Sequence, residues 1–476
     1  MKTNFLYKTS PWIAFLALII SACAPKLDKE FTPSKGSADF TKYVAVGNSL
    51  TAGFADGGLY LEGQQNSYPS MLAGQFKFVG GGDFQQPLFD ATQANGSGYL
   101  QLTGFFPNGS PILQPTTTML AIRGTTTPNP VLNPMGVLYT KYTNPINNYG
   151  VPGIRVSDIM DGNYASSNPF YERILTDAEI GANKTYLQKI SESQPTFFTC
   201  WLGNNDALQF AGSGGVVPLT PTDAFNQLYT GVITALTQNA AKGVVATIPD
   251  ITTIPLFTTV PPSLKKTLTA NGIPGLVVQS GRGLTKKGVD VTIIVVPTST
   301  LFDGTSGKVL LPLTAAGYLP LIGLKTGKYW NDFAKSNGIP RAIVYGAYGI
   351  DTTKMFGLDP SNPFPTGLIL DGTEIDNVTA SVNSYNATIK SVATAKGLAF
   401  VDFFQILKNY QTPQLINGAT YSSAFISGNL FSLDGVHLTP AGYAIVTNEY
   451  IKAINTTYQS NIPLVSVSQY RGVKFP

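Results

Sequence analysis

Short apolar runs alternate with stretches of helical spacing along much of the chain. Continuous apolar or β-branched runs, typical of strands buried on both faces, occur at 43–46, 196–202, 244–248 and 398–401. Apolar residues recur three or four apart over 225–236 and 378–392, as they do on one face of a helix. A third helix is predicted to begin at Thr439-Pro440, a favourable cap followed by a favourable first residue. Alternating helices and buried strands predict an α/β domain with a mostly parallel sheet.

Two long stretches interrupt this alternation. Residues 57–145 are rich in Gly, Thr, Asn and Pro, and residues 255–365 contain β-like runs such as 291–296 and 342–345 between many turns. We interpret both as insertions in one domain that spans 40–460 and is followed by a tail, 461–476. The alternative is that the stretch near 255–365 is an independent second domain.

The first 22 residues are predicted to be a targeting signal and are excluded from the fold. Lys2 and Lys8 precede an apolar run over 11–20, which is much shorter than the roughly 20 residues that span a bilayer. The run ends in Ile-Ser-Ala-Cys at 20–23, which resembles a bacterial lipobox. The alternative is an ordinary secretory signal in which the Cys is incidental.

The lipobox resemblance implies that the chain is cut before Cys23 and that this Cys then carries a lipid. Residues 23–39 are polar and contain prolines, so they are expected to be a flexible tether. The residue after Cys23 is Ala24 and not Asp, which in such lipoproteins argues against retention in the inner membrane. We therefore expect an outer-membrane lipoprotein of the cell envelope, on either its periplasmic or its surface face, with Cys200 left unpaired.

Composition narrows the chemistry that the chain can perform. Charged residues make up 12% of the 476 residues, against roughly 25% in an average soluble domain. With 31 Lys and Arg against 27 Asp and Glu there is no dense basic face, so no nucleic-acid partner is expected. Two Cys and one His are too few for a zinc cluster. Any chemistry that needs a histidine must use His437.

Two of four notable segments carry candidates for nucleophilic catalysis. Residues 47–50 (Gly-Asn-Ser-Leu) follow the first predicted strand, so Ser49 is either a nucleophile at the carboxyl edge of the sheet or a simple helix cap. Residues 434–437 (Asp-Gly-Val-His) precede the last helix. There, Asp434 could orient one ring nitrogen of His437 and leave the other free as a base, or His437 could merely be satisfied by its neighbours.

The other two segments carry candidate hydrogen-bond donors. Residues 149–153 (Tyr-Gly-Val-Pro-Gly) could direct the backbone N–H of Gly153 into a cleft, and residues 203–206 (Gly-Asn-Asn-Asp) follow a buried strand and offer an Asn side-chain amide. A developing oxyanion needs such preorganised donors. Taken singly, both segments are better explained as plain turns.

Taken in order, the four segments resemble the SGNH (GDSL-like) hydrolase family. The matching residues are Gly-x-Ser-Leu at 47–50, Gly153, Gly-x-Asn-Asp at 203–206 and Asp-x-x-His at 434–437. Asn48 differs, because the family name has Asp there, and we expect only a modest effect on catalysis. The resemblance covers the α/β elements around these segments and not the insertions. It implies a three-layer, flavodoxin-like, mostly parallel sheet, here with two large β- and loop-rich insertions.

The resemblance also assigns roles. Ser49 would attack an ester carbonyl, His437 would serve as general base and then general acid, and Asp434 would orient His437. The oxyanion hole would consist of the backbone N–H groups of Ser49 and Gly153 and the side chain of Asn205. The implied protein is a lipid-anchored serine esterase acting on acyl or acetyl esters of lipids or glycans, with no metal and no cofactor. The alternatives are a non-catalytic glycan- or lipid-binding lipoprotein on the same scaffold, or an acyltransferase.

Five aromatic residues in the insertions are candidates for a substrate cleft. They could line an apolar or glycan-facing surface, or they could form small cores within the insertions. They are Tyr60, Tyr68, Phe105, Phe106 and Trp330.

Overall fold

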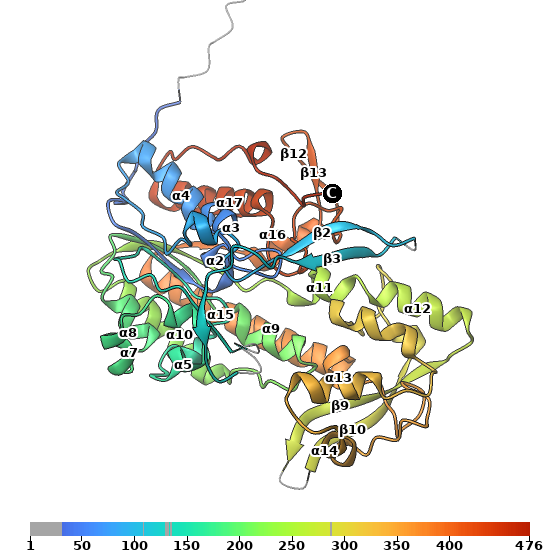
Figure 1. Cartoon of the computed structure of the whole chain (residues 1–476). Helices are drawn as coiled ribbons and strands as arrows, with labels where there is room; N and C mark the ends of the chain where they lie inside the picture. Colours follow the sequence, from blue (N-terminus) through green and yellow to red (C-terminus); the bar gives the residue numbers. More distant parts are fainter. Residues whose placement is uncertain (1–30, 108, 129–132, 134–135, 286–287) are drawn as a thin grey trace, which may run out of the picture. The chain divides into compact units, whose positions relative to one another are not determined.

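Five short strands form one parallel sheet in the computed structural model, in the spatial order β6-β1-β7-β8-β11 (Figure 1). The strands are β1 (Tyr43–Gly47), β6 (Asn148–Gly150), β7 (Phe197–Trp201), β8 (Lys242–Ala246) and β11 (Ala399–Val401). The expected α/β domain with a parallel sheet is thereby confirmed. The three-residue edge strand β6 is too short to stand out as an apolar run.

The structure describes residues 31–107, 109–128, 133, 136–285 and 288–476, and Ser34–Pro476 forms one compact unit. The predicted signal peptide and the predicted lipid attachment at Cys23 lie outside the described residues. Within the described ranges, no helix is both long enough and apolar enough to cross a membrane.

The sheet reverses its winding between β1 and β7. From β1 the chain moves outward to β6 on one side, and it returns to β7 on the other side and continues outward to β11. Gly47 is in register with Gly150 of β6 and with Trp201 of β7, so the carboxyl ends of these three strands are level. In open α/β sheets, ligands bind in the crevice at such a reversal. Three of the four notable segments therefore meet at one edge.

Helices cover both faces of the sheet, as alternate side chains of β7 show. The ring of Trp201 lies 5.8 Å from that of Tyr68 and 6.2 Å from that of Tyr450, centroid to centroid, whereas the neighbouring Cys200 interacts with Tyr229. Adjacent strand residues point to opposite faces. The packed helices are α4 (Tyr68–Phe76) and α17 (Pro440–Tyr458) on the Trp201 side and α8 (Tyr186–Ser191), α10 (Thr222–Leu236) and α15 (Gly372–Lys396) on the other.

The predicted helices are confirmed. The stretches 225–236 and 378–392 lie in α10 and α15, and α17 begins where the sequence indicates. Thr439 caps α17, because its hydroxyl accepts a 3.0 Å hydrogen bond from the Gly442 N–H. The remaining helices of this core are α5 (Tyr164–Ser167), α6 (Pro169–Glu172), α7 (Asp177–Gly181), α9 (Asn204–Gly212) and α16 (Phe403–Lys408).

The segment between β1 and β6 combines short helices with two hairpins. Besides α4, it contains α2 (Ser49–Ala52), α3 (Leu61–Gln65), β2 (Leu100–Phe105), β3 (Pro111–Pro115), β4 (Ile122–Thr125) and β5 (Val137–Tyr139). Strands β2 and β3 pair with each other, as do β4 and β5. Another antiparallel pair, β12 (Gln414–Ile416) with β13 (Ala419–Tyr421), lies between β11 and α17.

The segment between β8 and α15 gathers around its own hydrophobic cluster, which includes Leu276, Leu311 and Phe364. Its elements are α11 (Pro255–Thr258), α12 (Pro261–Ala270), β9 (Gly275–Thr285), β10 (Gly288–Pro297), α13 (Lys328–Ser336) and α14 (Arg341–Tyr348). The β-like run 291–296 lies in β10, as expected.

The run 342–345, in contrast, was predicted to be β-like and is helical in α14. Four consecutive apolar residues fit a buried helix turn as well as a strand. Pro340 precedes the helix and Gly349 ends it in a left-handed conformation at φ 64°, so both ends carry helix signals. Val344 then packs with Trp330 of α13. Tertiary packing therefore selects the helix.

Candidate active site

The turn after β1 presents Ser49 at the carboxyl edge of the sheet. A Cβ atom on Gly47 would lie 2.0 Å from Oγ1 of Thr51 and 2.8 Å from the carbonyl oxygen of Trp201, so only glycine fits there. Asn48 caps α2, because its Oδ1 accepts a 3.0 Å hydrogen bond from the Leu50 N–H. The alternative that Ser49 is merely a helix cap is therefore wrong, and its hydroxyl has a different partner.

Ser49, His437 and Asp434 are connected by hydrogen bonds in series. Oγ of Ser49 lies 2.8 Å from Nε2 of His437, and Nδ1 of His437 lies 2.8 Å from Oδ2 of Asp434. The ring of Phe54 lies against the imidazole, with 4.6 Å between the ring centroids. The single histidine of the sequence thus contacts the predicted nucleophile on one side and the predicted acid on the other.

The charge of Asp434 follows from its surroundings. Its Oδ1 accepts 2.8 Å hydrogen bonds from the N–H groups of Val436 and His437, and its Oδ2 accepts one of 2.7 Å from the Gly57 N–H. Burial alone would raise the pKa of Asp434, but the adjacent His437 and these donors outweigh it and hold that pKa well below its usual range. Ionised Asp434 only accepts, so Nδ1 of a neutral His437 donates to it and Nε2 is free to accept from Ser49.

Asp56 joins the start of the first insertion to the loop that carries Asp434. Its Oδ1 accepts from the Leu433 N–H at 3.0 Å, its Oδ2 accepts from the Tyr60 hydroxyl at 2.8 Å, and its own N–H donates to Oγ of Ser432 at 2.9 Å. The sequence motifs predict neither this contact nor the one from Gly57. The Asp-Gly pair at 56–57 signals a tight turn, but nothing local shows which distant loop that turn meets.

Besides the N–H of Ser49 itself, the predicted oxyanion donors lie on the loop after β6 and at the start of α9, which follows β7. Gly153 follows β6 with φ 83°, and its carbonyl accepts a 2.9 Å hydrogen bond from Nε2 of Gln209. Among the described residues, the backbone N–H groups of Ser49 and Gly153 have no hydrogen-bond partner. Nδ2 of Asn205 donates one hydrogen to the carbonyl of Ile154 at 2.9 Å, and its second hydrogen remains to be donated. All three predicted groups therefore retain a hydrogen to donate.

Asp206 fixes the two donor loops to each other. This buried carboxylate accepts from the N–H of Val156 at 2.8 Å, from the N–H of Ser157 at 3.4 Å and from the hydroxyl of Thr220 at 2.6 Å. Burial raises the pKa of Asp206 to about 6, although these donors oppose the shift. The Gly-x-Asn-Asp pattern at 203–206 suggested a role for Asn205 but none for Asp206.

An apolar pocket opens beside Ser49. Its polar lining residues are Asn48, Ser49, Asn204, Asn205 and His437. The rest of the lining is apolar and comprises Leu50, Trp201, Leu208, Pro249, Ile251, Ile254, Leu407, Phe431, Val436 and Leu438. A pocket with this composition suits a mainly aliphatic group of a substrate.

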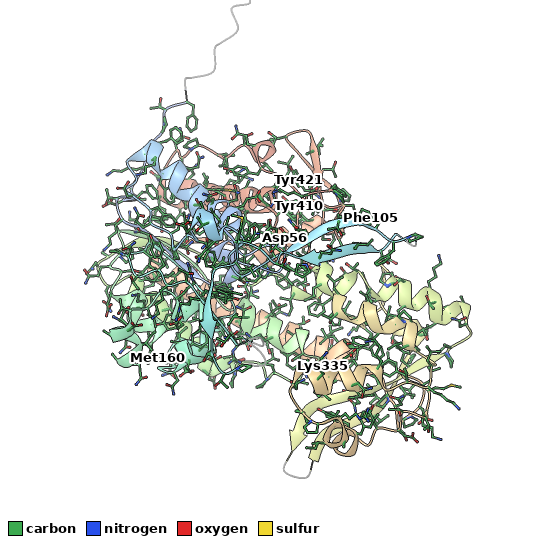
Figure 2. The ribbon with its side chains drawn as sticks, in the orientation of Figure 1. Asp56, Phe105, Met160, Lys335, Tyr410 and Tyr421 are labelled. Atoms are coloured by element: carbon green, nitrogen blue, oxygen red, sulfur yellow. The ribbon has the colours of Figure 1, made fainter. Side chains whose placement is uncertain are left out.

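None of the five aromatic candidates lines this pocket. Tyr60, Tyr68 and Trp330 are all buried. Trp330 lies in a small core of its own insertion, as the alternative interpretation has it, whereas Tyr68 belongs to the main hydrophobic core and Tyr60 stacks on Tyr99. Phe105 and Phe106 are exposed, and Figure 2 shows Phe105 on the β2–β3 hairpin. The apolar lining instead comes from the ends of the strands, the segments that follow them and the loop before α17. Single residues there, such as Ile251 and Leu407, carry no recognisable motif.

No group of three or more His, Cys, Asp or Glu side chains suited to a metal is found in the part of the chain that the structure describes. Comparisons of the chain with protein-family models, with curated proteins and with solved structures found no match.

Proposed function

We propose that the chain is a serine hydrolase of the SGNH type that cleaves carboxylic esters. The observation that carries the proposal is the series Ser49–His437–Asp434, with 2.8 Å at each link. A serine hydroxyl is a weak nucleophile at neutral pH and needs an adjacent base that a third group orients. The strand order, second-first-third-fourth-fifth along the chain, also fits the flavodoxin-like sheet that the family resemblance implies.

The first half of the reaction transfers the acyl group to the enzyme. Oγ of Ser49 attacks the ester carbonyl while Nε2 of His437 takes the hydroxyl proton. The carbonyl oxygen becomes an oxyanion, which the N–H groups of Ser49 and Gly153 and the side chain of Asn205 stabilise. The carbon–oxygen bond to the alcohol then breaks, and His437 returns its proton to that alcohol. Asp434 remains ionised throughout and stabilises the imidazolium.

The second half releases the acid. Water attacks the acyl carbonyl as Nε2 of His437 takes its proton, and the same three donors stabilise the second oxyanion. The bond to Oγ breaks and Ser49 regains its proton from His437. Each step needs only the ester and water, because the proton that His437 accepts is returned within the same half-reaction.

A covalent probe tests this proposal directly. The purified chain is incubated with a fluorophosphonate, digested and analysed by mass spectrometry, and its hydrolysis of p-nitrophenyl butyrate is measured in parallel. We expect a phosphonyl adduct on Ser49 and ester turnover, both lost in Ser49→Ala. Absence of an adduct on Ser49 together with absence of ester turnover would contradict the proposal.

We also propose that a lipid on Cys23 attaches the protein to the outer membrane, on the strength of the Ile-Ser-Ala-Cys signal at 20–23. Bacteria that express the chain are fed an alkyne-labelled fatty acid, and their membranes are fractionated. The label and outer-membrane sedimentation are expected for the natural chain and not for Cys23→Ala. Equal labelling of both would contradict the anchor.

A further inference from the structure

Two turns that lie far apart in the sequence meet at the proposed catalytic residues. The first spans 55–58, at the start of the first insertion, and its end residues exchange backbone hydrogen bonds of 3.0 and 2.9 Å. The second spans 431–438 and carries Asp434 and His437. Asp56, in the first turn, is only 6% exposed although it carries a carboxyl group. Burial of such a group costs free energy unless partners satisfy it, so its contacts call for an explanation.

Asp56 contacts the second turn at two consecutive residues. Its Oδ1 accepts from the Leu433 N–H at 3.0 Å, and its own N–H donates to Oγ of Ser432 at 2.9 Å. The same Ser432 hydroxyl donates to Oδ1 of Asp434 at 3.2 Å. Asp56 therefore holds the residue next to Asp434 and, through Ser432, reaches the Asp434 carboxylate itself.

The neighbour of Asp56 in the turn contacts Asp434 directly. The Gly57 N–H donates at 2.7 Å to Oδ2 of Asp434, the same oxygen that lies 2.8 Å from Nδ1 of His437. Asp56 and Gly57 have φ values of 54° and 75°, in the left-handed region that Asp and Gly enter more readily than most residues. A shift of this turn would therefore disturb the oxygen that orients the imidazole.

The first turn is also fixed from its other side. The Asp56 carbonyl accepts from the Leu100 N–H of β2 at 2.7 Å, and Oδ2 of Asp56 accepts from the Tyr60 hydroxyl at 2.8 Å. That hydroxyl lies 3.2 Å from Nη2 of Arg471, which can only donate, so the Tyr60 proton is directed to Asp56. Each polar atom of Asp56 thus has a partner, and these partners connect the insertion, the tail and the second turn.

We infer that Asp56 is a positioning residue for the proposed hydrolysis. It holds Ser432 and Leu433 and thereby keeps Asp434 where it orients His437. Asp56 does not line the apolar pocket of the site, so it acts through Asp434 and not on the ester. Displacement of a reacting group by about 1 Å can lower a rate by about 10²-fold. The inference rests on the proposed esterase function.

Two substitutions at position 56 test the role of the carboxyl group. Asp56→Gly removes it, while glycine suits the φ of 54° and keeps the N–H that donates to Ser432. We expect kcat for p-nitrophenyl butyrate to fall by about 10- to 100-fold with little change in KM, because the substrate contacts remain. Asp56→Asn removes the charge but keeps an oxygen for the Leu433 N–H, so most of kcat should be retained.

Asp371→Gly is the matched control. Asp371 is also 6% exposed, and it caps α15 by accepting from the N–H groups of Thr373 at 2.8 Å and Glu374 at 2.9 Å. Both glycine variants are expected to lower the midpoint of thermal unfolding, but only Asp56→Gly should lower kcat. A purely structural Asp56 would instead lower that midpoint and leave the kcat of the folded protein unchanged.

Substitution of Ser432 provides a second measurement. Ser432→Ala removes the hydroxyl that connects the Asp56 N–H to Asp434, so kcat should again fall with little change in KM. In the double variant of Asp56→Gly and Ser432→Ala, the fold-loss in kcat should be smaller than the product of the two single losses. Both substitutions act on the position of one carboxylate, and such effects are not independent.

The outcomes separate this inference from the proposed function. An unchanged kcat in folded Asp56→Gly would overturn the inference and leave the esterase intact. So would a loss confined to KM, or equal losses in Asp56→Asn and Asp56→Gly, since the charge and not the hydrogen bond would then matter. Turnover of no ester by the natural chain would overturn the proposed function and the inference with it. If Asp56→Gly does not fold, as thermal unfolding would show, Ser432→Ala decides alone.

Discussion

The regions around Asp434 and Asp206 share one structural feature, a buried carboxylate that accepts backbone hydrogen bonds, but the two carboxylates serve different purposes. In each, a buried carboxylate accepts backbone N–H groups from a loop that carries a site residue. Asp434 also contacts the His437 ring, and its pKa lies well below its usual range. The donors to Asp206 are all neutral, and its pKa is raised to about 6.

The difference between the two regions shows that neutral hydrogen-bond donors alone do not offset the effect of burial on the pKa of a carboxyl group. Desolvation is the largest influence on both pKa values, and at Asp434 the contact with the His437 ring, together with the backbone donors, reverses its effect. The Asp434 region therefore holds the charge that proton transfer by His437 needs. The Asp206 region holds two donor loops in place and needs no permanent charge to do so.

Removal of the Asp434 charge is expected to produce the largest effect among the variants that test this comparison. In Asp434→Asn the side chain no longer fixes the proton on Nδ1 of His437, so kcat for p-nitrophenyl butyrate should fall by about 10⁴-fold. Steady-state kinetics measure this loss. Asp206→Asn is the matched control, with kcat expected to stay within about tenfold of the natural chain. Equal losses in the two variants would remove the functional distinction between the regions.

Loss of the Asn205 side chain tests the donor region. Asn205→Ala is expected to lower kcat by about 10² to 10³-fold with little change in KM, because the lost hydrogen bond is strongest in the transition state. Gln209→Leu is the control, since it removes only the 2.9 Å hydrogen bond that supports the Gly153 carbonyl and should cost less. A loss confined to KM would show that Asn205 binds substrate and does not stabilise an oxyanion.

The opposite pKa shifts predict opposite effects of pH on stability. Folded Asp206 binds its proton with a pKa of about 6, above the unfolded value of about 3.9, so its contribution to the unfolding free energy decreases by about 3 kcal/mol as pH rises through 4 to 6. Asp434 contributes stability that is present above about pH 4 and is lost as pH falls towards its lowered pKa.

Urea unfolding at several pH values between 4 and 7 measures this smaller effect. Asp206→Asn lacks the titrating group, so its unfolding free energy relative to that of the natural chain should rise across this pH range. Parallel pH profiles for the two proteins would show that the carboxyl of Asp206 is not perturbed in the folded state.

Local patterns in the sequence were sufficient for the strand–helix alternation and for the placement of Ser49 and His437. Thr439 caps the helix that directly follows it, so its role can be inferred from the local sequence. The run 342–345 was ambiguous because four apolar residues do not define a period. The contacts of Asp56 with Leu433 and Ser432 join positions more than 370 residues apart, and no local signal specifies such a pairing.

Mutation of the only histidine tests the central claim most directly. Because the sequence has no other His, no second imidazole can replace His437. Hydrolysis of p-nitrophenyl butyrate by purified His437→Ala should be slower than that by the natural chain by at least about 10⁴-fold, and labelling of Ser49 by the fluorophosphonate should be lost with it. Turnover by His437→Ala within tenfold of the natural rate would contradict a Ser49–His437–Asp434 mechanism.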